Sequence, residues 1–278
     1  ISNAGLKRLS VARLHDSVRD LLSYKHTISY SGSLSGETVL TELRRFYEDV
    51  DGNLREPPAF QPLLIREPPE TQIYFFDKEM AQTHVRIESG DEPYTETRRP
   101  AIDLYNDYFD GGMSGIVFQE LREARALAYS AGARYLHAHR ADDPNLMAAM
   151  IGCQADKTPE ALGAFLALID NMPESPERFE AAKAGLINQY RTARLDFRTI
   201  LGEVRKWERQ RVAVDPRAWR FERIQQSSLE GMLDFYREHI QGRPKLISIV
   251  GDRSKFDLAS LEQYGEIVEL SVEDIFSY

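Results

Sequence analysis

The sequence predicts an α+β fold in which a mainly antiparallel sheet is packed by helices on one side. Three observations support this fold class. Strand-like segments occur in pairs, at 72–76 with 83–87 and at 129–139 with 145–154. Helix-like segments follow them in a cluster, and one helix–strand–glycine–helix order occurs twice along the chain. Paired strands followed by clustered helices are typical of α+β proteins rather than of alternating α/β proteins.

Composition limits the class of protein. The 278 residues are 42% hydrophobic and 28% charged, as in ordinary globular proteins. A formal net charge of −9 argues against nucleic acid as the main partner, because phosphate backbones attract basic surfaces. No apolar run approaches the ~20 residues that a membrane-spanning helix needs. The single cysteine, Cys153, excludes an internal disulfide bond and argues against a cysteine-based zinc site.

The order helix, short strand, glycine, helix occurs near both ends of the chain. The first copy covers residues 9–47, with a strand expected at 26–30. The second copy covers residues 229–264, with a strand expected at 246–250, and a further strand follows it. We interpret the two copies as an internal repeat, the end of one domain followed by a complete domain of the same kind. Chance recurrence is the alternative, because such units are common in proteins that contain both helices and strands.

The repeat and the linker composition give the expected domain boundaries. Residues 51–70 contain five prolines among charged residues, which is typical of an extended linker. We therefore expect the C-terminal tail of a preceding similar domain at 1–50, the linker at 51–70 and a complete α/β domain at 71–278. The chain begins Ile-Ser-Asn-Ala without an initiator methionine, so residues 1–4 are expected to derive from an expression tag on a fragment of a longer protein.

Hydrophobic periodicity and turn residues place the elements of the expected complete domain. Short hydrophobic or β-branched runs predict strands at 72–76, 83–87, 129–139, 145–154, 246–250 and 267–270. Amphipathic patterns predict helices at 100–109, 114–124, 159–171, 176–197, 200–212, 228–239 and 256–264. Proline at the first position of the helices beginning at 159 and 176 supports both starts, because proline is favoured there.

One segment between these elements carries candidate chemistry. In the helix expected at 114–124, Phe118 and Arg122 are four residues apart and therefore project together from one face. The turn after this helix would let Tyr129, at the start of the next strand, fold back towards Arg122. A guanidinium and a phenol are strong hydrogen-bond donors, and a fixed donor aimed at a developing oxyanion lowers the barrier to amide hydrolysis. Spacing alone also fits a simpler interpretation, an exposed helical arginine and a half-buried strand tyrosine.

Residues 111–130 read GGMSGIVFQELREARALAYS, which resembles the pitrilysin/insulysin family of zinc metallopeptidases in their C-terminal, zinc-free type of domain. The resemblance implies a pitrilysin-like (metallohydrolase-type) fold, in which two halves of paired α/β domains close around a peptide. It implies that Arg122 and Tyr129 bind substrate and stabilise the transition state, with Phe118 as the nearby substrate-binding aromatic residue. Only residues 111–130 match specifically, and Ala126 stands where the family usually has glycine.

The zinc-binding motif of that family, H-x-x-E-H, is absent from this chain. None of the six histidines is followed three positions later by Glu-His. His84 and Glu88 lie too far apart along a strand to share a metal. His137 and His139 share a strand face, but no third ligand accompanies them. We therefore expect no metal site and no cofactor in this fragment, with zinc in a partner half.

The resemblance implies that the chain is the zinc-free C-terminal part of a zinc metalloendopeptidase, which binds peptide and supplies Arg122 and Tyr129 to a zinc-bearing half. That half is expected on the same chain or on a separate subunit, and the fragment alone is expected to be inactive. Two alternatives stay open: a catalytically inert peptide-binding or scaffold subunit of the same fold, and an unrelated α+β module in which both residues are structural. Large bacterial family members are often exported, so the resemblance is compatible with a periplasmic location.

Overall fold

The computed structural model describes residues 3–47, 54–62, 65 and 67–276. The chain divides into two compact units. The larger unit comprises residues 64–193 and 206–271, and the smaller unit comprises residues 1–63, 194–205 and 272–278. Among the helices in the described ranges, none is both long enough and apolar enough to cross a membrane.

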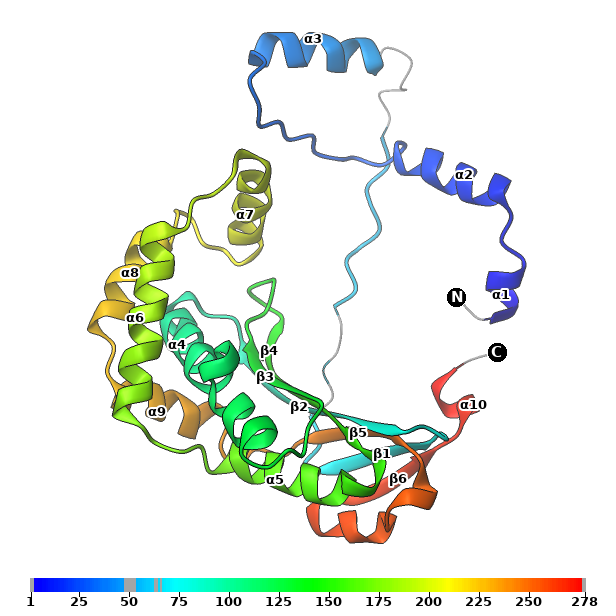
Figure 1. Ribbon diagram of the computed structural model, residues 1–278. Helices are drawn as coiled ribbons and strands as arrows, with labels where there is room; N and C mark the ends of the chain where they lie inside the picture. Colours follow the sequence, from blue (N-terminus) through cyan, green and yellow to red (C-terminus); the bar gives the residue numbers. More distant parts are fainter. Residues whose placement is uncertain (1–2, 48–53, 63–64, 66, 277–278) are drawn as a thin grey trace. The chain divides into compact units, whose positions relative to one another are not determined.

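The larger unit is built on a mixed sheet (Figure 1). Within the described residues, this sheet has six strands in the order β3-β4-β2-β5-β1-β6. The bounds are β1 Gln72–Asp77, β2 Gln82–Pro93, β3 Ser130–Leu136, β4 Pro144–Gln154, β5 Leu246–Gly251 and β6 Glu266–Leu270. The pairs β3–β4, β4–β2 and β2–β5 are antiparallel, whereas β1 pairs in parallel with both β5 and β6. The sheet is therefore mainly antiparallel, as predicted, with a parallel part at one edge.

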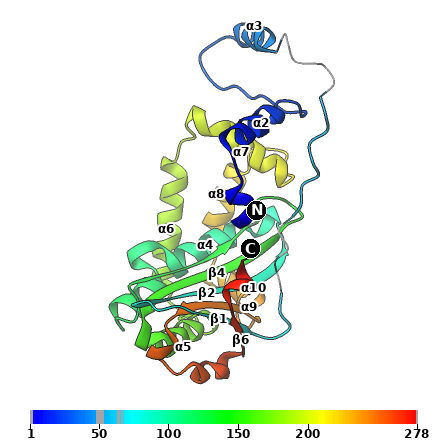
Figure 2. The same cartoon turned by 90° about the vertical axis from the view of Figure 1, so that its right-hand side faces the viewer.

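Helices pack against one face of this sheet, and Figure 2 shows α5 beneath the strands in a second view. The helices of the larger unit are α4 Arg99–Asp110, α5 Thr158–Asp170, α6 Pro176–Thr192, α8 Arg217–Gln226 and α9 Leu229–His239. Helices α4 and α5 contact the strands, and α6, α8 and α9 pack on α4. Helix α7, Phe197–Arg209, spans the boundary between the two units. Side chains alternate along β2, where Val85 and Ile87 are buried while His84 and Arg86 are exposed. Because successive strand side chains point to opposite faces, the buried set faces the helices. The predicted fold class is confirmed.

Helix α4 lies at the centre of the core. Its sequence RPAIDLYNDYFD places proline in the first turn, and it buries Ile102, Leu104, Tyr105, Tyr108 and Phe109. The ring of Tyr105 stacks on that of Phe109 with a centroid separation of 5.3 Å, and it lies 5.9 Å from the ring of Phe235 on α9. Aromatic side chains of this size bury much apolar area, so they fix α4 against α9.

Polar side chains of α4 also pair with the edge strand β3. The Asn106 side chain donates to the Tyr135 carbonyl (3.0 Å) and accepts from the Tyr135 N–H (2.8 Å). One turn later, Asp110 Oδ2 accepts from the Ala133 N–H (3.0 Å). An edge strand presents unpaired backbone groups, and these side chains satisfy three of them. The helix that precedes the candidate site is thereby fixed to the strand that follows it.

Several elements differ from the sequence prediction. The strands predicted at 72–76 and 83–87 exist, but β5 lies between them, so they are not neighbours. Helix α8 was not predicted. The helix predicted at 176–197 ends at Thr192, and the segment predicted as a helix at 256–264 forms a 3-10 helix, Leu258–Tyr264. Local pattern specifies neither the order of strands in a sheet nor the exact ends of helices, so these differences depend on tertiary contacts.

The smaller unit contains α1 Asn3–Lys7, α2 Val11–Leu21, α3 Gly36–Phe46 and α10 Val272–Ile275. Both α2 and α3 begin at a serine N-cap, Ser10 and Ser35, whose side chain accepts a backbone N–H of the first turn. The strand predicted at 26–30 does not form; this stretch is irregular, and the nearest pairing is a bridge between Tyr24 and Arg55. Residues 48–53, 63, 64 and 66, which include parts of the predicted tail and linker, lie outside the described residues, as do residues 1 and 2.

Candidate functional site

The site segment begins with a glycine turn that follows α4. Gly112 has φ +69°, a left-handed conformation that glycine adopts without a steric penalty. A Cβ atom at Gly115 would lie 2.7 Å from the Gly111 nitrogen and 2.9 Å from the Asp110 carbonyl carbon. These positions need glycine because the chain reverses tightly against the end of α4. The glycines thus set the direction of the helix that carries Phe118 and Arg122.

That helix is a π-helix over residues Phe118–Glu123, where we predicted an α-helix at 114–124. The Gln119 N–H still bonds the Gly115 carbonyl four residues back (3.1 Å), but the Ala124 N–H bonds the Gln119 carbonyl five residues back (2.9 Å). A wider helical turn of this kind is rare and is frequently found at functional sites. The spacing of apolar residues alone does not distinguish an α-helix from a π-helix, so the π-helix could not be predicted from the sequence.

Phe118 and Arg122 lie together, as their spacing predicted. The guanidinium carbon of Arg122 is 5.0 Å from the centroid of the Phe118 ring. Arg122 is exposed, whereas Phe118 is half-buried. A guanidinium over an aromatic face is held by a cation–π attraction of about 0.5–1 kcal/mol at an exposed site. The Phe118 ring therefore restricts where the Arg122 charge can lie.

A tight turn connects Arg122 to Tyr129. Ala126 has φ +49°, one of two non-glycine residues with positive φ in the described chain. Its N–H bonds the Arg122 carbonyl (3.2 Å), and the Leu127 N–H bonds the Leu121 carbonyl (3.0 Å). Leu127 is 6% exposed, so its side chain anchors the turn in the core. An alanine in the left-handed region costs about 1–2 kcal/mol, so this turn is strained where glycine would not be.

Tyr129 stands at the beginning of β3. Its N–H bonds the Gly152 carbonyl of β4 (2.8 Å), and its side chain is 77% exposed. In the described residues, no hydrogen bond joins its hydroxyl to the Arg122 guanidinium. The structure thus brings Arg122 onto Phe118 and leaves Tyr129 exposed on the following strand, with the backbone of both residues fixed by hydrogen bonds. Both side chains are available to donate to a carbonyl oxygen.

Gly152, opposite this strand start, has two polar neighbours that the sequence did not suggest. A Cβ atom at Gly152 would lie 2.9 Å from Ser130 Oγ and 3.6 Å from His84 Nδ1. Ser130 and His84 both pair with Gly152 across the sheet. Glycine inside a strand often marks a place where another backbone approaches closely. In the sequence, the feature that could have indicated this close approach is a glycine within the apolar run 147–153.

Within the part of the chain that the structure describes, the side chains that could donate to a metal do not fit a zinc ion. No cluster of three or more His, Cys, Asp or Glu side chains with metal-binding geometry occurs in the residues that the structure describes. His137 and His139 have ring centroids 6.4 Å apart. Burial, with the nearby Arg99 charge, lowers the pKa of His137 to about 3. Cys153 is fully buried, and burial raises the pKa of its thiol, as befits a small core residue.

A buried polar cluster at the other end of β2 was missed. The Asp91 carboxylate accepts a hydrogen bond from the Tyr135 hydroxyl and lies 2.8 Å from His239 Nδ1, and Arg243 Nη1 lies 3.4 Å from it. Burial opposes the Asp91 charge, but these hydrogen bonds prevail and lower the pKa of Asp91. Burial and the same carboxylate raise the pKa of Tyr135. Because the cluster joins β2, β3, α9 and the turn after α9, its role is structural.

Comparison with known proteins places the chain in a family. The sequence profile described as the peptidase M16 inactive domain matches residues 9–186. An uncharacterized zinc protease of Streptomyces coelicolor is 29% identical over 140 residues, which cover 49% of this chain and 29% of that protein. The chain therefore matches less than a third of the length of this relative.

Solved structures share the fold. A peptidase M16 inactive domain from Pseudomonas fluorescens superposes with a TM-score of 0.63 at 16% identity, covering 88% of this chain and 58% of that one. A conserved protein from Enterococcus faecalis gives a TM-score of 0.65 at 17% identity, covering 90% and 57%. Because the matched profile extends over more than half of the sequence, the interpretation as an unrelated α+β module is wrong, and the chain belongs to the peptidase M16 inactive-domain family.

Proposed function

We propose that this chain binds the peptide substrate of a zinc metalloendopeptidase and supplies Arg122 and Tyr129 to stabilise the transition state. The zinc is assigned to a partner half, on the same chain or on a separate subunit. The donor set of this chain favours that assignment, because no H-x-x-E-H occurs in the sequence and no ligand cluster occurs in the described residues.

The observation that carries the proposal is that one segment exposes two hydrogen-bond donor side chains whose backbone is held by hydrogen bonds. Tyr129 is 77% exposed although its backbone is bonded into the sheet. Arg122 is exposed and held over the Phe118 ring. A large exposed tyrosine and a restrained charge on the same segment suit ligand contact better than packing. Residues whose own backbone is fixed lose less entropy when they bind.

Each side chain has a distinct task in this proposal. The Tyr129 hydroxyl donates to the carbonyl oxygen of the scissile amide, where negative charge develops during attack. A donor aimed at that position typically contributes about 10²–10³ in rate. The Arg122 guanidinium donates to a neighbouring substrate carbonyl and positions the peptide backbone. The half-buried Phe118 ring supplies an apolar contact for a substrate side chain.

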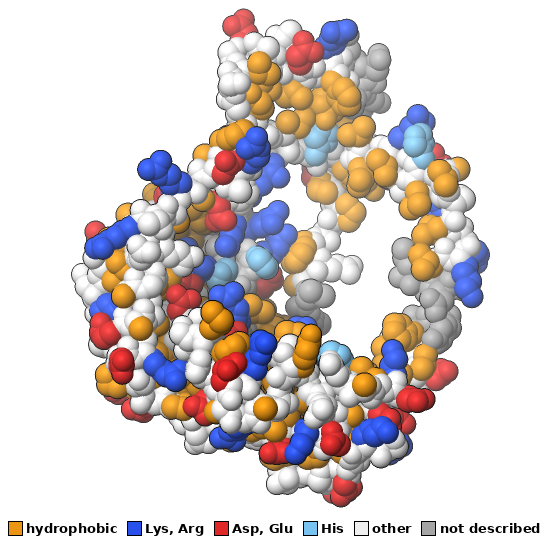
Figure 3. Space-filling view, in the orientation of Figure 1, with side chains coloured by type: hydrophobic (Ala, Val, Ile, Leu, Met, Phe, Trp, Pro, Cys, Tyr) orange, Lys and Arg blue, Asp and Glu red, His pale blue; other side chains and the backbone are white. Residues whose placement is uncertain are grey.

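The domain arrangement is part of the same proposal. Residues 71–278 would form one complete domain, residues 51–70 a linker, and residues 1–50 the tail of a preceding similar domain. The apolar side chains of α2 support this assignment, because Val11 is 85% exposed, Val18 63% and Leu21 65%. Figure 3 shows hydrophobic side chains gathered on the surface of α2 and α3. Helices of this kind normally bury their apolar stripe against another element.

The test is reconstitution of this chain with a zinc-bearing half of the family, followed by steady-state kinetics on a quenched fluorescent peptide. Tyr129→Phe is expected to lower kcat by about 10²–10³ with little change in KM, because the donor acts mainly on the developing oxyanion. Arg122→Gln is expected to raise KM as well as lower kcat, since a ground-state contact to the backbone is lost.

Matched controls separate chemistry from folding. Arg125→Gln removes another exposed arginine of the same segment, and Tyr190→Phe removes a phenol on α6; both should leave the kinetics unchanged. Undiminished turnover of Tyr129→Phe would remove Tyr129 from the mechanism. Tight peptide binding without any turnover in the reconstituted pair would favour the alternative, a catalytically inert peptide-binding or scaffold subunit.

A further inference from the structure

A surface cavity of about 340 Å³ lies between α4, α8 and α9. Its wall is apolar at the base and polar at the rim. The base residues are Pro100, Ala101, Leu104, Trp219 and Met232; the rim residues are Thr97, Arg223, Gln226, Ser227 and Ser228. Leu104 and Met232 are 1% exposed, so the base belongs to the core. A concave apolar site with a few polar groups at its mouth is the usual form of a small-molecule site, and this volume is at the lower end of the common range.

At Gly231 no side chain enters the cavity. Gly231 lies in the first turn of α9 and lines the cavity. A Cβ atom there would meet only Ser228 Oγ, at 3.5 Å, so the space beyond is free. The φ of Gly231 is not positive, and glycine in a helix costs roughly 1 kcal/mol relative to alanine. Packing and backbone geometry therefore do not require glycine at this position.

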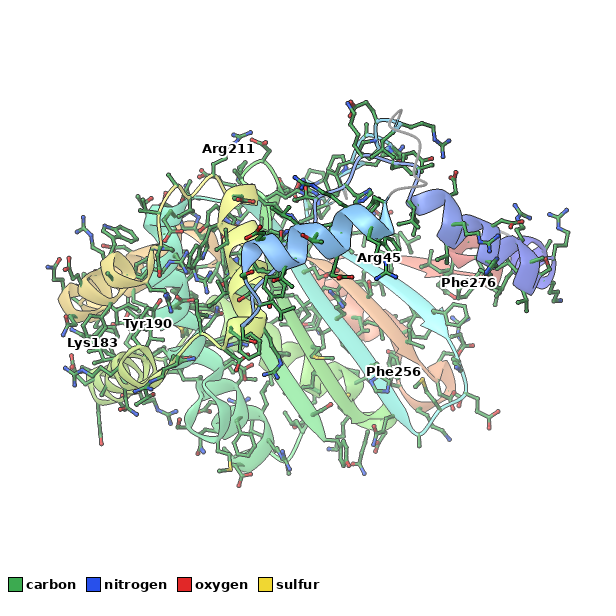
Figure 4. All side chains as sticks on the ribbon, turned by 90° about the horizontal axis from the view of Figure 1, so that it is seen from above. Arg45, Lys183, Tyr190, Arg211, Phe256 and Phe276 are labelled. Carbon is green, nitrogen blue, oxygen red and sulfur yellow. The ribbon has the colours of Figure 1, made fainter. Side chains whose placement is uncertain are left out.

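Positive charge gathers at the rim. The Arg223 guanidinium carbon lies 5.7 Å from the Trp219 ring centroid, and Arg223 forms no ion pair within the described residues. Lys183 Nζ donates to the Ser227 carbonyl at 2.7 Å. Figure 4 shows Lys183 on α6, beside α8. The N-terminus of α9 begins at the N-cap Ser228, where the helix dipole adds partial positive charge.

Two carboxylates that precede lining residues in the sequence pair with other residues. Glu96 accepts two hydrogen bonds from Arg220, at 2.5 and 2.7 Å. Glu230 pairs with Arg237 at 2.7 Å. Among the residues that line the cavity, the charged side chain is that of Arg223, so the complementary ligand is an anion.

We propose that this cavity binds a small amphipathic carboxylate, whose apolar body contacts Trp219, Leu104 and Met232 and whose carboxylate pairs with Arg223. Arginine binds a carboxylate through two parallel N–H donors, which gives orientation as well as affinity. This site shares no residue with Phe118, Arg122 and Tyr129, and it goes beyond the proposed function. A failure of one proposal therefore leaves the other unaffected.

The test uses 3-phenylpropionate as the probe and its neutral isostere 3-phenylpropanamide as the comparison. Trp207 and Trp219 are the two tryptophans of the chain. Trp207→Phe in the full chain leaves Trp219 as the fluorescent reporter inside the cavity. Saturable quenching by the carboxylate is expected, with the amide binding about tenfold more weakly because the charge-assisted pair with Arg223 is lost. Equal affinities of acid and amide would overturn the proposal.

Two variants, each with a matched control, locate the bound probe. Gly231→Leu should fill the cavity and abolish binding of both compounds, whereas Gly185→Leu, another helical glycine with nothing within 4 Å of its Cβ, should not change it. Arg223→Gln should reduce carboxylate affinity about tenfold to the level of the amide. Arg191→Gln, which removes an arginine 6.0 Å from the Phe221 ring, should leave affinity unchanged. The site would be refuted if Gly231→Leu binds the probe as the parent does. It would also be refuted if the parent chain shows no saturable binding.

Discussion

Residues 11–46 and residues 229–270 follow the same order of elements, yet they end in different environments. Each begins with an amphipathic helix, α2 or α9, followed by a short β-branched segment, a glycine and a second helical segment. In the later region, α9 buries Met232, Leu233, Phe235 and Tyr236, and β5 lies between β2 and β1. In the earlier region, α2 and α3 bury no residue.

The difference shows what an amphipathic pattern can and cannot specify. A helix satisfies its backbone hydrogen bonds internally, so α2 forms from its N-cap and its local sequence. A strand has no internal partners, so residues 26–30 form no strand where no neighbouring strand is present among the described residues. The same pattern therefore determines a helix in both regions but a strand in only one.

The largest expected contrast comes from one substitution made in both regions. Ile249→Ala in β5 removes a side chain that is 1% exposed, so it should lower the free energy of unfolding by about 2–5 kcal/mol. Ile28→Ala removes a side chain that is 47% exposed and should cost less than about 0.5 kcal/mol. Urea denaturation followed by far-UV circular dichroism measures both. Similar losses would mean that residues 26–30 are packed in solution.

Charge pairs should show the same contrast. Asp91→Asn leaves the buried His239 and the half-buried Arg243 without their carboxylate, so a loss of about 3 kcal/mol is expected. Asp20→Asn breaks the exposed pair with Arg55 and should cost less than about 1 kcal/mol. Because folding lowers the pKa of Asp91, its stabilising contribution is present above the unfolded pKa and is lost as pH falls through the folded value. Denaturant titrations near pH 7 and near pH 3 test this. If the stability of Asp91→Asn depends on pH as strongly as that of the parent, Asp91 is not the source of the pH dependence.

Histidines extend the comparison to mild acid. The pKa of His137 is lowered to about 3, so the folded protein resists a proton that the unfolded chain accepts below about pH 6.5. Stability should therefore fall as pH is lowered from about 7 to about 5, by on the order of 1 kcal/mol, and His137→Gln should remove this loss. His26→Gln, in the exposed region, should retain it. Thermal melts of both variants at the two pH values measure this loss. An unchanged pH dependence in His137→Gln would contradict the proposal that His137 causes it.

The smallest expected effect concerns strain in the site segment. Ala126→Gly replaces an alanine at φ +49° with the residue that adopts this conformation freely, so stability should rise by about 0.5–1 kcal/mol. Ala124→Gly, two residues earlier at φ −76°, is the control and should not stabilise. Differential scanning calorimetry resolves the shift. If Ala126→Gly destabilises the protein, the turn is not strained in solution.

Much of the larger unit was predictable from local pattern. The segments predicted at 100–109, 145–154 and 159–171 form α4, β4 and α5 within one or two residues of their expected ends. The motif at 111–130 led to the family, which the profile match confirms. Helix α8 was missed because it is highly polar: it buries Arg220, whose charge is acceptable there only because Glu96 binds it.

The residues of the candidate site were identified from sequence, but their surroundings were not. The spacing of Phe118 and Arg122 predicted their contact. The π-helix, the positive φ of Ala126 and the close approach of Ser130 to Gly152 depend on how the segment is held between α4 and β4. The roles of Arg122 and Tyr129 in catalysis stay predictions until the kinetic test is made.

By itself, the sequence determined the helices that have a clear apolar face, such as α4, α5 and α9, and the glycine turn that reverses the chain after α4, because these depend on interactions between residues close along the chain. Only the tertiary structure decided the strand order β3-β4-β2-β5-β1-β6, the absence of a strand at 26–30 and the buried cluster around Asp91. Those features join residues far apart in sequence, and a hydrogen bond or ion pair between them exists only once packing has removed the competing water.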